Sequence, residues 1–157
     1  MNKIPKILFL HGREGTPEGS KVTHLRDCGY RVIAPVLPKD SLDLSIKRAQ
    51  NCFDAFLPDI IIGSSRGGAV ACSIKGSNTP KILIAPAYNK FRCQINDIDD
   101  STIVLHCPDD DIVSFEDSKN LVEAFNVDLR SCGICHRMKD PDALKNLITA
   151  IEEQLSK

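Results

Sequence analysis

Residues 59–74 read D-I-I-I-G-S-S-R-G-G-A-V-A-C-S-I, and the predicted fold is organised around this stretch. It opens with three consecutive isoleucines, residues 60–62. Such a run of β-branched residues is typical of a strand buried on both faces, as in a parallel sheet. The next five residues, G-S-S-R-G, match the G-x-S-x-G nucleophile elbow, in which a serine stands on a sharp turn between a strand and a helix. Small residues follow at 68–71 and suit that helix.

The elbow pattern has a physical reason. Ser65 would occupy the tight turn with strained backbone angles and present its hydroxyl above the edge of the sheet. Gly63 and Gly67 stand two residues to either side, and they carry no Cβ that would clash across so sharp a bend. The backbone N–H of Arg66, at the start of the helix, would point at a developing oxyanion.

Composition excludes several classes of protein. The 157 residues are expected to form one domain, residues 1–157, with a full core. The net charge is −1, so no basic surplus indicates nucleic acid as a partner, and no run of charges indicates a charged tail. No stretch is long and apolar enough for a membrane span. Seven scattered cysteines without an export signal indicate reduced thiols in a cytoplasm.

Apolar runs and helical spacings alternate along the whole chain. This alternation predicts the α/β class, with a parallel sheet covered by helices on both faces. Ligands of such sheets bind beyond the carboxyl ends of the strands, where the loops with chemically active side chains follow. The expected strands are 6–10, 30–34, the run from 60, 81–85, 102–107 and 127–131, and the expected helices are 18–28, 41–56, the one after Ser65, 114–125 and 141–154.

Four segments carry a resemblance to a known family. They are L-H-G-R-E-G (10–15), G-S-S-R-G-G (63–68), L-H-C-P-D-D-D-I-V (105–113) and G-I-C-H (133–136). Together they resemble the α/β-hydrolase superfamily, in particular its small esterases without a lid, and serine, acid and histidine come in that superfamily's order. The resemblance implies a single three-layer α/β/α domain with six strands, all parallel, a minimal form of the fold.

The resemblance also implies a catalytic triad. Ser65 would be the nucleophile, and His136 would be the base, because it follows the acid in the loop after the last strand. The acid lies among residues 109–111, and aligning the family pattern on His106 and Val113 assigns it to Asp110.

The other histidines are expected to have no part in proton transfer. His24 is predicted to be a surface residue of a helix. The family pattern makes His11 a structural residue beside the oxyanion hole. His106, at the end of a strand, is predicted to be a packing residue.

The oxyanion hole would combine the N–H of Arg66 with a second N–H near Gly12 or Arg13. The two arginine side chains leave two alternatives open. Each guanidinium could point away, lying on the surface or pairing with a carboxylate such as Glu14. One could instead face the pocket and favour substrates that carry a carboxylate or phosphate.

Residues 132–136 read C-G-I-C-H and match two other patterns, c-type haem attachment and a C-x-x-C redox pair. Haem attachment needs an export route, and a thioredoxin-like pair stands at a helix start after an early strand; neither condition is met here. The favoured interpretation is that two ordinary cysteines flank His136. No cofactor and no metal are therefore predicted.

The expected function is hydrolysis of an ester or thioester of a small molecule through an acyl-enzyme on Ser65. The connection 86–100 is too short for a cap domain, so the site should be open, with walls from the loops after Leu10, Pro35 and Ala85. The alternative is a binding module that keeps the fold but has lost its activity. The oligomeric state is not indicated.

Overall fold

The computed structural model describes residues 3–13, 15–76 and 78–157. Six strands form one sheet in the order β2-β1-β3-β4-β5-β6, and all neighbouring pairs are parallel. The predicted all-parallel sheet is therefore confirmed. Each strand lies within a residue or two of the predicted run, and the bounds are β1 Lys6–Leu10, β2 Arg31–Ile33, β3 Ile60–Ser64, β4 Lys81–Ile84, β5 Ile103–His106 and β6 Asp128–Ser131.

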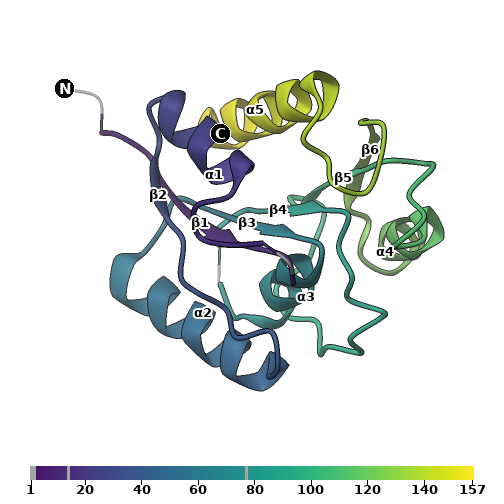
Figure 1. The fold of residues 1–157 in the computed structure, drawn as a ribbon, viewed down its shortest axis with the longest axis horizontal. Helices are drawn as coiled ribbons and strands as arrows, with labels where there is room; N and C mark the ends of the chain where they lie inside the picture. Colours follow the sequence, from purple (N-terminus) through teal and green to yellow (C-terminus); the bar gives the residue numbers. More distant parts are fainter. Residues whose placement is uncertain (1–2, 14, 77) are drawn as a thin grey trace.

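Helices cover both faces of the sheet, as expected for a three-layer α/β/α structure (Figure 1). One buried cluster joins α1 and α5 to one face, through residues such as Leu25 and Leu147. A second cluster joins α2, α3 and α4 to the other face, through residues such as Phe53, Val70 and Leu121. The bounds are α1 Ser20–Asp27, α2 Leu42–Phe56, α3 Arg66–Ser73, α4 Phe115–Phe125 and α5 Pro141–Leu155.

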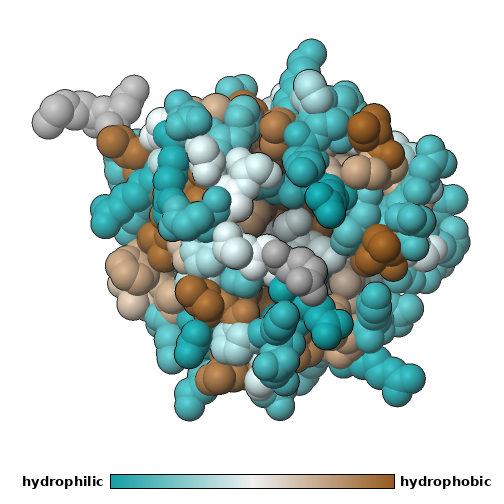
Figure 2. All heavy atoms as spheres, viewed as in Figure 1, coloured by the Kyte–Doolittle hydropathy of each residue, from teal (hydrophilic) through white to brown (hydrophobic). Residues whose placement is uncertain are grey.

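Local chemistry explains where the helices begin. The Ser41 hydroxyl caps α2 by accepting a hydrogen bond from the N–H of Leu44 at 3.1 Å, as predicted. Helix α1 starts later than residue 18, because the N–H of Gly19 donates to the Thr16 carbonyl in a turn that precedes the helix. The surface is mostly hydrophilic on the face shown in Figure 2, with hydrophobic side chains in separate spots.

The topology fixes where a site can form. From β1 the chain crosses to β2 on one side and then returns to β3 on the other side. The loops that follow β1 and β3 therefore separate at this point and leave a crevice beyond the strand ends. Residues 85–102, between β4 and β5, contain no helix. In the part of the chain that the structure describes, no helix combines the length and apolar character that a membrane span requires.

Candidate active site

Ser65 lies on the sharp turn between β3 and α3. Its backbone angles, φ 55° and ψ −114°, put a non-glycine residue at positive φ, which is the strained conformation predicted for an elbow. Two hydrogen bonds hold the turn to the next strand: Ser65 N–H donates to the Ile84 carbonyl at 2.8 Å, and Ala87 N–H donates to the Ser65 carbonyl at 3.0 Å. The strain is thus balanced by the surrounding main chain.

The glycines of the elbow are required by close contacts between backbones. A Cβ on Gly67 would lie 1.9 Å from the carbonyl oxygen of Leu10, and one on Gly63 would lie 2.3 Å from the carbonyl oxygen of Gly67. Neither contact is possible for real atoms, and both neighbours are main chain, which cannot move aside cheaply. These contacts bring the start of α3 directly against the end of β1.

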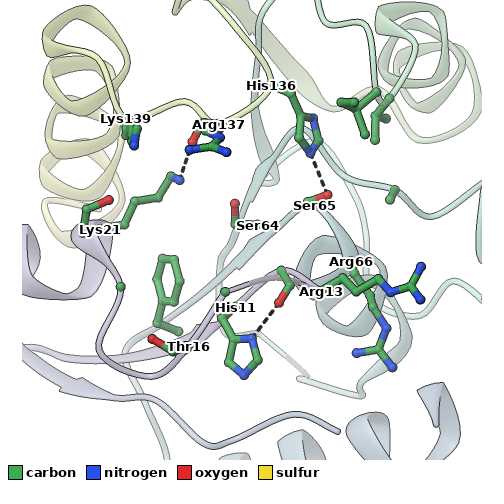
Figure 3. A pocket seen from close by; sticks show the side chains of 18 of the residues that line it. His11, Arg13, Thr16, Lys21, Ser64, Ser65, Arg66, His136, Arg137 and Lys139 are labelled. Atoms are coloured by element: carbon green, nitrogen blue, oxygen red, sulfur yellow. Dashed lines mark hydrogen bonds between the residues drawn. The ribbon is translucent and has the colours of Figure 1, made fainter. Parts of the chain in front are cut away.

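Three of the predicted residues come together above the sheet. Ser65 Oγ lies 2.9 Å from His136 Nε2, and His136 Nδ1 lies 2.7 Å from Asp110 Oδ2. Figure 3 shows the first of these contacts in the pocket. The Asp110 side chain is fully buried, whereas Asp109 and Asp111 are exposed. Among the three neighbouring aspartates, Asp110 alone therefore has the geometry of an acid that orients the histidine.

Four N–H groups surround the Asp110 carboxylate. Oδ1 accepts from the backbone N–H groups of Ile112 and Val113, each at 2.8 Å, and Oδ2 lies within hydrogen-bond distance of His136 and His106. Burial alone would raise the pKa of the Asp110 carboxyl. The bonds from Val113, His136 and Ile112 outweigh it and hold this pKa below its usual value. Asp110 is therefore a carboxylate at neutral pH.

His106 ends β5 and packs against Phe115 in the core, as predicted, but it also contacts the acid, which was not predicted. Its side chain is completely buried, with Nε2 3.0 Å from Asp110 Oδ2 and Nδ1 2.6 Å from Ser118 Oγ. Burial lowers the pKa of His106, although the charge of Asp110 opposes this shift. A neutral ring fits its neighbours if Ser118 donates to Nδ1 and the Nε2–H points at Asp110 and at the Val113 carbonyl. His106 and His136 therefore contact the same carboxylate oxygen of Asp110, His106 from the core and His136 from the pocket.

The loop after β1 lies beside Ser65. A Cβ on Gly12 would come within 3.5 Å of Ser65 Cβ, so the Gly12 backbone borders the serine directly. His11 fixes this loop, since the Leu37 N–H donates to its Nε2 at 3.0 Å and its Nδ1 lies 2.7 Å from the Gly12 carbonyl. The N–H of Arg66 is the first of α3 and has no acceptor within that helix. The main chain of the loop after β1 and the first N–H of α3 thus both border Ser65, where an oxyanion hole was predicted.

The Arg66 side chain follows neither of the two predicted alternatives. Its guanidinium is buried and donates to the Pro38 carbonyl at 2.9 Å and to Ser45 Oγ at 3.2 Å, and it lies 5.7 Å from the centre of the Phe91 ring. Burial, with a further contribution from the charge of Arg13, lowers its pKa. Arg66 therefore anchors the chain before α2 and is not paired with a carboxylate of the described residues.

Arg13 is exposed at the mouth of the pocket, next to Arg66 in Figure 3. The pairing suggested for Glu14 lies outside the described residues. His24, on α1, is partly exposed and does not line the pocket.

A pocket of about 600 Å³ opens above Ser65. The loops after Leu10 and Ala85 form part of its wall, as predicted, but the loop after Pro35 does not. The loop after β6, where His136 was predicted to lie, also lines the pocket, and so does helix α1, which was not predicted to do so. Its lining contains basic side chains and, among the described residues, no acidic one. The basic residues are Arg13, Lys21, Arg66, Lys90, Arg137 and Lys139.

The two cysteines of the C-x-x-C-H segment differ in exposure, since Cys132 is buried and Cys135 is exposed. All seven cysteines are free thiols. Burial, followed by the charges of Asp142 and Asp140, raises the pKa of the Cys132 thiol to about 11, whereas a reactive redox cysteine needs a lowered pKa. The described residues contain no group of three or more side chains that could hold a metal ion.

The sequence matches no family model and no curated protein. Solved structures match over nearly the whole chain. A Xanthomonas campestris protein described as a hydrolase of the alpha/beta superfamily has 19% identity and a TM-score of 0.81, with 98% of each chain covered. Mouse alpha/beta hydrolase domain-containing protein 10 has 17% identity and a TM-score of 0.77, over 99% of this chain and 91% of that one.

Est1E from Butyrivibrio proteoclasticus has 17% identity and a TM-score of 0.71, over 99% of this chain and 90% of the other. At such identities the likeness concerns the fold. The chain has the α/β-hydrolase fold, in a form with six parallel strands.

Proposed function

We propose that the protein is a serine hydrolase that cleaves an ester or thioester of a small substrate through an acyl-enzyme on Ser65. The observation that carries this proposal is the chain of contacts from Ser65 Oγ to His136 Nε2 at 2.9 Å and from His136 Nδ1 to Asp110 Oδ2 at 2.7 Å. The neighbouring structures agree with a hydrolase, since they include Est1E and an esterase domain from Rhodothermus marinus.

Each residue has a distinct role in the proposed mechanism. His136 accepts the Ser65 proton at Nε2 as the oxygen attacks the carbonyl carbon, and then gives that proton to the leaving group. Asp110 keeps the Nδ1–H tautomer of His136 and stabilises the imidazolium without taking the proton itself. The backbone N–H of Arg66, with that of Gly12 or Arg13, stabilises the oxyanion. Water then attacks the acyl-enzyme by the same route and releases the acid.

The test uses a fluorophosphonate probe, which reacts with activated serines, together with turnover of para-nitrophenyl butyrate. We expect wild type to be labelled, and Ser65→Ala to lose both the label and at least about a thousandfold in kcat. Ser64→Ala is the matched control, because it removes the neighbouring hydroxyl and should remain labelled.

Two outcomes contradict the proposal. Undiminished labelling and turnover in folded Ser65→Ala would show that another group is the nucleophile. A wild type that neither reacts with the probe nor hydrolyses esters would favour the alternative function, a binding module that has lost its activity.

A further inference from the structure

The charge of the pocket differs from the charge of the whole chain. The chain carries a net charge of −1, yet six cationic side chains line the pocket above Ser65 and none of them forms an ion pair with a carboxylate of the described residues. A cleft lined by charges of one sign concentrates their field and attracts ligands of the opposite sign.

Five of the six cations form two groups on either side of the serine. In Figure 3, Lys21, Arg137 and Lys139 lie to one side of Ser65, and the pair Arg13 and Arg66 lies to the other. The Arg66 guanidinium is not free for a ligand, because it is buried and bonded to the chain before α2. The group around Lys21 is the better candidate for binding.

The Lys21 side chain extends from α1 into the pocket and links α1 to the loop that carries His136. Its Nζ donates a hydrogen bond to the Arg137 carbonyl at 2.6 Å. Among the described residues, this is the one hydrogen bond that the Lys21 ammonium makes. An ammonium group has three N–H donors, so two remain for a ligand. Lys139 comes from the same loop and is exposed, with no ion-pair partner among the described residues.

Two cations held close together without a counter-ion are unfavourable in the free protein. Burial, followed by the charge of Lys139, lowers the pKa of Lys21 to about 8. An anion placed between the two ammonium groups would remove this repulsion and accept the unused N–H donors in charge-assisted hydrogen bonds.

We infer that the substrate carries an anionic group, a carboxylate or a phosphate, that lies against Lys21 and Lys139 while its reacting carbonyl lies at Ser65. This inference rests on the proposed function and adds the class of substrate to it. Recognition would come from the partly buried Lys21 ammonium on α1, which is bonded to the Arg137 carbonyl, and from the exposed Lys139 ammonium on the loop after β6.

The test compares esters that differ only in charge. One series varies the acyl group among para-nitrophenyl butyrate, succinate and phosphonopropionate. A second series varies the leaving group among acetate esters of para-hydroxybenzoate, its methyl ester and para-hydroxyphenyl phosphate. The measured quantity is the ratio of kcat/KM between the anionic and the neutral ester. The two series distinguish the side of the substrate that carries the anion, and the two anions distinguish carboxylate from phosphate.

We expect an anionic ester to be preferred at least about tenfold in one series, because a charged hydrogen bond in a partly buried site contributes that much. Lys21→Met keeps the apolar stem and should remove most of the preference. Lys139→Gln should reduce it and remains informative if Lys21→Met does not fold. Lys145→Met removes an exposed charge of α5 outside the pocket and should leave the ratio as in wild type.

A preference below about threefold in both series, or one that both variants retain, would overturn the inference and leave the esterase function intact. Absence of turnover for every ester would overturn the proposed function, and this inference with it.

Discussion

The turn that carries Ser65 and the pocket rim that carries Lys21 are built in opposite ways. The turn consists of consecutive residues, 63–68, most of them buried, and main-chain atoms make its decisive contacts. The rim joins residues 116 positions apart, because the Lys21 side chain donates to the Arg137 main-chain carbonyl. Backbone geometry therefore positions the proposed chemistry, whereas side chains that can change without disturbing the core determine what is bound.

The strongest test of this contrast adds one methyl group to the Ser65 turn and, in a separate variant, one methyl group to the pocket rim. Gly67→Ala puts a Cβ 1.9 Å from the Leu10 carbonyl oxygen, so it should lower the free energy of unfolding by more than about 3 kcal/mol. Gly19→Ala is the matched change at the rim, where a Cβ would lie 3.4 Å from the Thr16 carbonyl oxygen. It should lower the free energy of unfolding by less than about 1 kcal/mol. Urea unfolding of both variants measures the difference, and equal losses would refute the contrast.

The same contrast explains what could be predicted from the sequence. Strands such as β1 and β3 are continuous buried apolar runs, and the elbow is a local pattern, so both were predicted nearly to the residue. The approach of residues 65, 110 and 136 followed from the rule that parallel strands end at one edge.

The roles of His106 and Lys21 could not be predicted in this way. The bond from His106 to Asp110 depends on a tight turn that brings residue 110 back over the strand end, and its tautomer depends on Ser118 of α4. Lys21 is one polar residue of a helix face, and only the packing of α1 against the sheet turns it towards the pocket. Both are long-range effects of tertiary structure.

A second prediction concerns the two histidines that contact the Asp110 carboxylate, His106 in the core and His136 in the pocket. His106→Phe removes a donor to Asp110 but keeps an aromatic ring beside Phe115, and we expect kcat/KM to fall by about tenfold or more. The remaining charge on Oδ2 would then favour the His136 imidazolium, so the acidic limb of the pH profile should move to higher pH.

The pH profile separates this positioning role from a purely structural one. His106→Gln, which restores an N–H donor, should recover part of the activity and of the shift. His24→Gln, on α1, is the control and should match wild type. An unmoved acidic limb in folded His106→Phe would show that His106 only fills space.

The smallest expected effect is a change with pH in the preference for anionic esters, and it tests the charge of Lys21 at the pocket rim. Lys21 has a pKa of about 8 and is protonated below it, so the preference for anionic esters should be greatest near pH 7 and fall as the pH rises through about 8. The groups whose charges act on Lys21 are Lys139 and Cys135 of the loop after β6. Taking the ratio of anionic to neutral kcat/KM cancels the pH dependence that the two reactions share.

We expect a loss of up to about tenfold in this ratio between about pH 7 and about pH 10. In Lys21→Met the ratio should be flat over the same range. A wild-type ratio that does not change with pH would show that Lys21 does not contribute charge to recognition.

The three residues of the proposed triad stand at the ends of β3, β5 and β6, and this spacing has a consequence for how the chain matures. Ser65 is synthesised early, but its partner His136 lies in the loop after β6, which is the last strand to be made and forms one edge of the sheet. Contacts so distant in sequence form late in folding, after the loops between them have closed. A partly folded chain would therefore hold an inert serine, and the return of fluorophosphonate labelling during refolding would time the docking of the final strand.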